Sequence, residues 1–183
     1  MSETPAPNSQ SAKSQSPFWR FSISFYAVPG VAPACIELQD RAGVDVNVLF
    51  FLLWSATLGR ALSAAEVAAL DKTIGAWRDM TVVPLRNIRR ALKEPPAIVA
   101  PGIAETFRSR IKSAELEAER LQQEAMYGLT LTGPLGQPAA NAASAAKAST
   151  DAYQSVLGPF PTGPLEAILS ALAKFDPGPS GGA

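Results

Sequence analysis

The feature that most constrains this chain is an apolar run from Val44 to Leu58, which carries Asp45 and Asn47 only at its start. If residues 45–61 form a helix, nearly every face of that helix is apolar. A helix that is apolar all round must be covered by neighbouring elements or by lipid. The run is shorter than the roughly 18 to 20 residues that a membrane-spanning helix needs. We therefore expect residues 45–61 to form the buried central helix of a helical domain.

Proline and glycine residues divide residues 17–128 into further helical segments. Pro29 and Gly30 end a short first helix, and Gly43 is suited to end the second one. Pro84 has no N–H to donate, so we expect it to kink or end the fourth helix. Sustained alternation of apolar and polar residues, the mark of strands, is scarce. The pattern predicts an all-α fold, a single bundle of five to six helices in orthogonal or up-and-down order.

The longest expected helix runs from about Pro101 to Tyr127. Its apolar residues recur at close to heptad spacing, which is typical of a helix that pairs with another helix. This predicted apolar stripe consists of Ile103, Phe107, Ile111, Ala114, Ala118, Leu121 and Ala125.

The two ends of the chain have a different composition. Residues 1–16 are rich in Ser, Pro, Gln and Ala, so we expect disorder there, as also for residues 177–183. Residues 129–163 are rich in Ala, Gly, Pro, Ser and Thr, which predicts a flexible linker within a low-complexity C-terminal tail. Residues 164–176 recover a helical period and predict a short amphipathic helix, which is marginal alone in water. This tail helix either folds back on the core or binds a groove on another protein.

The composition excludes several classes of enzyme. The chain has no histidine, which removes Ser-His-Asp and Cys-His nucleophiles and the commonest zinc ligand. Cys35 is its one cysteine, which excludes an internal disulfide and suits a reducing compartment. The chain has 16 Lys and Arg residues and 16 Asp and Glu residues, which gives a formal net charge of zero. This balance does not favour a nucleic-acid partner. We expect a cytoplasmic protein with no catalytic residues, no cofactor, no metal, no secretory signal and no membrane span.

Asp40 and Asp45 are the weak candidates for a metal or phosphate-ester site, because Asp40 closes one expected helix and Asp45 opens the next. Their spacing matches no common metal motif, however. The alternative is structural: Asp45 has the position of a helix cap, accepting the N–H of Asn47 or Val48. We favour the cap. Ser63 is expected to cap the following helix through a capping box with Glu66.

A basic helical face is the other candidate site. It consists of Arg86, Arg89, Arg90 and Lys93, at helical spacing i, i+3, i+4 and i+7. Such a face could bind an anion such as a phosphate or an RNA backbone. It could instead pair internally with the acidic residues of the long helix, which is the interpretation we favour.

Three segments resemble an uncharacterised family of proteobacterial proteins, domain of unknown function family 2390. They are FWRFSISFYAVPGVAPACIELQDRAGVDVNVLFFLLW, WRDMTVVPLRNIRRALK and ELEAERLQQEA, in this order between about Phe18 and Ala125. The resemblance implies a small, all-helical cytoplasmic bacterial protein. It brings no activity, cofactor or catalytic residue with it.

These observations favour a non-enzymatic protein–protein interaction or adaptor module. One alternative is a binder or enzyme of a phosphorylated small molecule that uses Asp40, Asp45 and the basic face, which requires a pocket joining them. A second alternative is weak RNA or ribosome association through the basic face. The expected partner is a protein, and the sequence leaves the oligomeric state open.

Overall fold

The computed structural model describes residues 15–176, which are helical apart from connecting turns and two short strands. This confirms the predicted all-α class. The disorder expected for residues 1–14 and 177–183 lies outside the described residues. Ser16, also expected to be disordered, is buried, and its hydroxyl accepts the backbone N–H of Trp19 at 3.1 Å.

The elements, in chain order, are α1 (Pro17–Tyr26), α2 (Val31–Ala42), α3 (Val46–Thr57), β1 (Arg60–Ala61), α4 (Ala64–Trp77), the π-helical segment η1 (Arg78–Val82), α5 (Val83–Ala91), α6 (Pro101–Thr130), β2 (Gln137–Pro138), α7 (Ala142–Leu157) and α8 (Thr162–Lys174).

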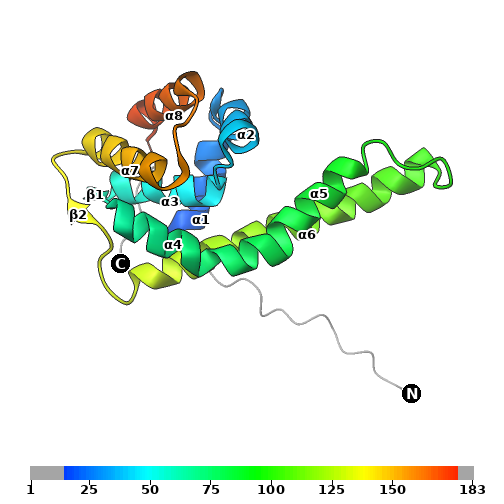
Figure 1. The fold of residues 1–183 in the computed structure, drawn as a ribbon, viewed down its shortest axis with the longest axis horizontal. Helices are drawn as coiled ribbons and strands as arrows, with labels where there is room; N and C mark the ends of the chain where they lie inside the picture. Colours follow the sequence, from blue (N-terminus) through cyan, green and yellow to red (C-terminus); the bar gives the residue numbers. More distant parts are fainter. Residues whose placement is uncertain (1–14, 177–183) are drawn as a thin grey trace, which may run out of the picture.

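The centre of the fold is α3, the helix expected from the apolar run. Every residue from Asn47 to Ala56 is buried, so α3 is covered on all sides. Figure 1 shows α1, α4 and α7 arranged around it. Gly43 ends α2 in the left-handed conformation at φ +66°, which lets the chain turn directly into α3. The buried central helix is therefore confirmed.

The predicted flexible linker, residues 129–163, is wrong for most of its length. It contains α7, which packs along α3 and α4, and Tyr153 of α7 is fully buried. Ala145, Ala146 and Ser149 form a buried face of small side chains, and this allows α7 to approach α3 closely. The composition resembled a linker because that close approach requires the same small residues that flexible linkers contain.

The turn before α7 is also ordered. β2 pairs antiparallel with β1, with Arg60 opposite Pro138 and Ala61 opposite Gln137. Gly136 has φ +73°, and an added Cβ would lie 2.7 Å from the carbonyl oxygen of Ala61, so only glycine fits.

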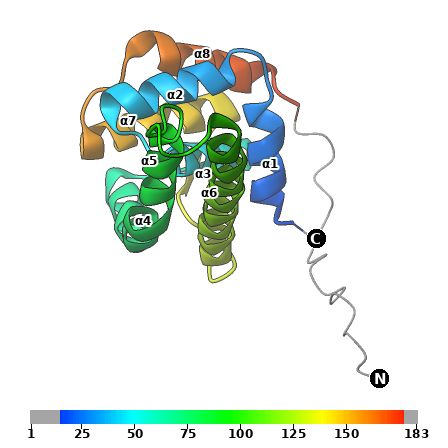
Figure 2. The same ribbon diagram turned by 90° about the vertical axis from the view of Figure 1, so that its right-hand side faces the viewer.

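The tail helix lies on its own core. α8 packs against α2, and Ile168 and Leu172 are buried there. Figures 1 and 2 both show α8 beside α2. The amphipathic helix expected at residues 164–176 therefore completes the domain, and its apolar face is not free for another protein.

The remaining helices form a long arm. Pro84 does not end the helical path. Instead the chain passes from α4 through η1 into α5, and the N–H of Val83 bonds to the carbonyl of Arg78. The wider π turn accommodates a residue that lacks an N–H. α5 and the N-terminal half of α6 then run antiparallel and project from the body as a two-helix arm (Figure 1).

Within residues 15–176, no single helix is both long enough and apolar enough to cross a bilayer. α1 and α2 taken together pass the same test of length and composition, but the chain bends by 98° between them.

Candidate functional site

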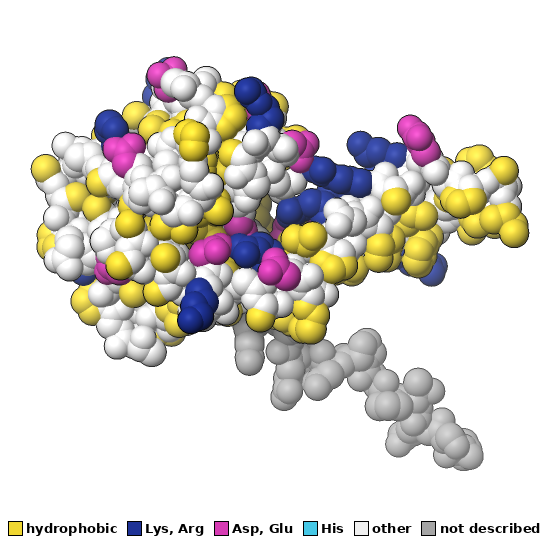
Figure 3. All heavy atoms as spheres, in the orientation of Figure 1, with side chains coloured by type: hydrophobic (Ala, Val, Ile, Leu, Met, Phe, Trp, Pro, Cys, Tyr) yellow, Lys and Arg dark blue, Asp and Glu magenta, His cyan; other side chains and the backbone are white. Residues whose placement is uncertain are grey.

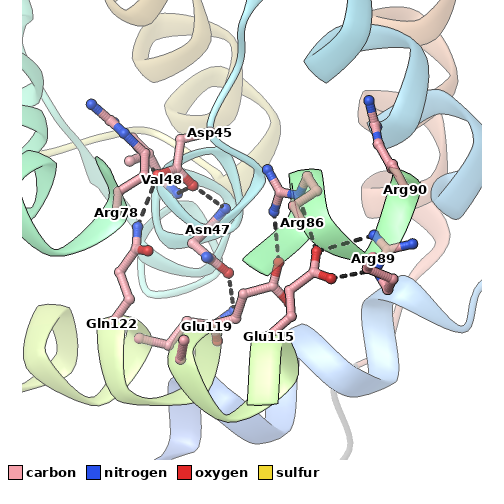
Figure 4. Close-up of polar contacts among 12 residues, drawn as sticks. Asp45, Asn47, Val48, Arg78, Arg86, Arg89, Arg90, Glu115, Glu119 and Gln122 are labelled. Atoms are coloured by element: carbon pink, nitrogen blue, oxygen red, sulfur yellow. Dashed lines mark hydrogen bonds and ion pairs between the residues drawn. The ribbon is translucent and has the colours of Figure 1, made fainter. Parts of the chain in front are cut away.

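Asp45 occupies a polar junction between α3, η1 and α6. Its Oδ1 accepts the backbone N–H of Asn47 at 2.8 Å and that of Val48 at 3.4 Å, so Asp45 is the N-cap of α3. Its Oδ2 accepts the side-chain amide of Gln122 at 2.8 Å and lies 3.5 Å from Arg78 (Figure 4). Both carboxylate oxygens therefore have protein partners, and the predicted cap is present.

Asp40 points to a different place. Its Oδ1 lies 2.8 Å from Arg90 of α5, and its side chain is 45% exposed. The hydrogen bond from Arg90 lowers the pKa of Asp40. Asp40 thus contacts the arm, whereas Asp45 contacts η1 and α6. The two carboxylates do not converge, and residues 15–176 contain no group of three or more His, Cys, Asp or Glu that could hold a metal ion.

The basic face is directed largely inward. Arg86 lies 3.1 Å from Glu115 and 2.7 Å from Glu119, and Arg89 also bonds to Glu115 (Figure 4). Arg90 is paired with Asp40, as described above. Of the four cations only Lys93 is exposed without an ion pair among the described residues.

These pairs form the ionic interface between α5 and α6. Glu115 is only 5% exposed, and a buried carboxylate is tolerated when charged hydrogen-bond donors surround it. The hydrogen bond with Glu115 raises the pKa of Arg89, which holds it charged. Burial raises the pKa of Glu119, and the nearby Arg86 opposes that shift. The arrangement fixes the two helices of the arm together, and both of its carboxylates, Glu115 and Glu119, are paired with arginines.

The other polar candidates also have structural roles. Ser63 caps α4: its hydroxyl accepts the N–H of Glu66 at 3.3 Å, and the Glu66 carboxylate accepts the N–H of Ser63 at 2.8 Å. Cys35 is buried in α2, and burial raises the pKa of its thiol to about 12. A thiol with this pKa is a poor nucleophile at neutral pH.

The long helix α6 buries a face that is largely polar. Its buried residues are Ala104, Glu115, Ala118, Gln122, Gln123 and Met126. Of the apolar stripe predicted for this helix, only Ala118 is buried and Ile111 is half-buried. The other five members, Ile103, Phe107, Ala114, Leu121 and Ala125, are exposed.

The inner face of α6 is polar for two reasons. Glu115 and Glu119 meet Arg86 and Arg89, and Gln122 and Gln123 donate to the side chains of Asp45 and Asn47. One signal in the sequence could have identified it. Glu115 and Glu119 lie at i, i+4 spacing, and Gln122 and Gln123 follow on the same face.

The exposed face of α6 carries a row of residues at heptad spacing. We call it the outer stripe, and it consists of Ile103, Phe107, Arg110, Ala114, Glu117 and Leu121, all of them exposed. Ile103 is 67%, Phe107 49% and Leu121 42% exposed. Large exposed apolar side chains that lie together are a common feature of interaction surfaces.

The outer stripe begins at an open apolar cleft at the tip of the arm. The cleft has a volume of about 540 Å³ and is lined on one side by Leu92, Pro95 and Val99 and on the other by Ile103 and Phe107. Figure 3 shows hydrophobic side chains gathered at this tip. The tip and the outer stripe form the candidate interaction surface of the protein.

Comparison with known proteins identifies the family and nothing beyond it. No curated protein and no solved structure matches the chain. The model of one family, Protein of unknown function (DUF2390), matches residues 17–126, which run from the start of α1 to near the end of α6. The matched segment includes the buried α3, the ionic interface of the arm and the outer stripe. The chain therefore belongs to the family described as Protein of unknown function (DUF2390).

Proposed function

We propose that this protein is a non-enzymatic protein-binding module whose arm carries the binding surface. The observation that supports this most is the exposure of large apolar side chains along the arm. Ile98 at the tip is 91% exposed, and Ile103 and Phe107 follow on α6. Single exposed apolar residues are common, but a contiguous group on a projection is typical of a recognition surface.

The cleft at the tip supports a particular mode of binding. A groove between the loop at residues 92–100 and the first turns of α6 suits the apolar face of an amphipathic helix. The ionic interface beneath it holds the two helices of the arm in a fixed arrangement, so the groove is formed before a partner arrives.

The alternative functions have less support. A phosphorylated small molecule would need free carboxylates and free arginines around one pocket, but Asp40 and Arg90 bond to each other and Asp45 is used as a cap. RNA association through the basic face would rest on Lys93, because the three arginines of that face are paired. Protein binding through the arm therefore remains the best-supported function.

A photo-crosslinking amino acid placed on the arm tests this proposal. It replaces Ile103 in one variant and Leu157 in another; Leu157 is an apolar residue on α7, 41% exposed, and α7 packs against α3, α4 and α8. After irradiation of cells that naturally make the protein, we expect a discrete protein adduct from position 103 and none from position 157. The adduct from position 103 should disappear when Phe107→Glu is added.

The result that would contradict the proposal is no adduct from position 103, or the same adducts from both positions. We also propose that binding takes place in the cytoplasm, so the adduct is expected in the cytoplasmic fraction.

A further inference from the structure

The outer stripe of α6 has the geometry of one half of a helix pair. Its members follow one another at intervals of 4, 3, 4, 3 and 4 residues. This 3.5-residue average keeps all six side chains facing one partner helix. From Ile103 to Leu121 the stripe is about 27 Å long, at 1.5 Å per residue. In Figure 2, α6 is flanked by α5 on one side and by α1 on the other. The outer stripe is left exposed between them.

We infer that the outer stripe binds a second copy of this chain, with the two α6 helices antiparallel. This inference rests on the proposed function and names the partner of the same surface. The stripe is complementary to itself when it is reversed. If Arg110 lies opposite the partner's Ala114, then Ile103 lies opposite the partner's Leu121 and Phe107 opposite the partner's Glu117. Each of these layers occurs twice, because the pair has a two-fold axis.

The layers match in size and in polarity. Ile103 and Leu121 give an apolar contact at each end of the pair. Arg110 and Ala114 combine a long side chain with a small one, so the helices can approach without a clash. At Phe107 the ring packs on the methylene groups of the partner's Glu117, whose carboxylate remains at the edge of the contact.

Charge selects the antiparallel direction. Within residues 15–176, Arg110 has no hydrogen bond or ion pair in the single chain. In the antiparallel pair it lies one layer from the partner's Glu117, within reach of an ion pair. A parallel pair would place Arg110 against Arg110 and Glu117 against Glu117, and like charges directly opposite each other are destabilising.

The short length of the stripe sets the expected strength. Interfaces at the small end of the specific range are weak or transient. We therefore expect a dimer that dissociates at concentrations on the order of micromolar.

Analytical ultracentrifugation of the full chain from about 1 to 300 µM tests the inference, the range being set by that expectation. The apparent mass should rise from the 19.2 kDa of one chain toward twice that value. Arg110→Glu alone and Glu117→Arg alone should each weaken association at least about tenfold, the size expected of introduced charge repulsion. A mixture of these two variants should associate again, because each position then faces the opposite charge. Leu157→Glu, which adds a charge to an exposed residue of α7, should leave association unchanged. Circular dichroism of each variant checks that it is folded.

Two results would overturn the inference. One is a chain that stays monomeric over the whole range. The other is a dimer that is unaffected by the charge reversals, which would place the interface elsewhere. If the chain is monomeric but position 103 still gives an adduct with another protein in cells, this inference fails and the proposed function stands. If neither association nor an adduct is seen, both fail.

Discussion

Glu115→Gln is the substitution that tests the ionic interface of the arm most directly. The Glu115 side chain is 7% exposed, and it accepts hydrogen bonds from Arg86 and Arg89. Glutamine keeps the shape but removes the charge, and it replaces one accepting oxygen by a donating amide. Arg89 then loses its carboxylate partner, whereas Arg86 keeps Glu119.

The expected loss of stability follows from this arrangement. Removing one partner of a fully buried ion pair costs about 3 to 5 kcal/mol. The two arginine side chains are partly exposed and one retains a partner, so we expect about 2 to 3 kcal/mol for Glu115→Gln. For a chain of this size each kcal/mol lowers the melting temperature by about 2 to 4 °C, which gives about 4 to 12 °C.

Urea unfolding followed by circular dichroism at 222 nm measures this loss. Glu37→Gln is the matched control, because Glu37 is exposed on α2 and pairs with Arg41 on the same helix at 2.5 Å. An exposed pair of this kind contributes less than about 0.5 kcal/mol. Because the arm could open locally, amide hydrogen exchange of α5 should accelerate in Glu115→Gln and not in the control. Equal stability and equal exchange in the two variants would refute the ionic interface.

Two further predictions concern the body of the protein. Asp45→Ala should cost about 2 to 4 kcal/mol, since it removes the cap of α3 and leaves the buried amide of Gln122 without its acceptor. Ser63→Ala, which removes an exposed cap, should cost only about 1 kcal/mol; chemical denaturation of both variants checks the order, and equal losses would contradict it. Cys35 should react with a thiol reagent at neutral pH only after unfolding. Burial raises the pKa of this thiol from 9.0 to about 12, so the unfolded chain ionises first and the free energy of unfolding falls as pH rises through that range. Cys35→Ala should reduce that fall by up to about 1.4 kcal/mol per pH unit, and an unchanged slope would show that Cys35 is not shielded.

The elements predicted successfully are those whose structure depends on residues close by in the sequence. The apolar run requires burial wherever it lies, and Asp45 caps α3 because a cap depends on neighbours two and three residues away. The same holds for Ser63 and Glu66. Capping interactions that span two or three residues can be recognised directly from the sequence.

The errors arose where a distant partner decides the role of a residue. Residues 142–157 have the small side chains of a linker, and they form α7 because α3 supplies the apolar surface against which they pack. On α6 the heptad-spaced apolar stripe predicted a contact with another helix, but within the chain the arginines of α5 bind the opposite face, where Glu115 lies. Apolarity alone did not reveal which face turns inward, because the inner face of the arm is ionic.

Oxidative footprinting of the dilute full chain tests the central claim, that the outer stripe of α6 faces solvent as a binding surface. We predict rapid labelling of Phe107 and Leu121 and slow labelling of Phe51, which is fully buried in α3. Raising the concentration should protect Phe107 and Leu121 while an exposed body residue such as Leu157 keeps its rate. Labelling of Phe107 and Leu121 as slow as that of Phe51 in the dilute chain would contradict the account, since it would show that this face of α6 is turned inward.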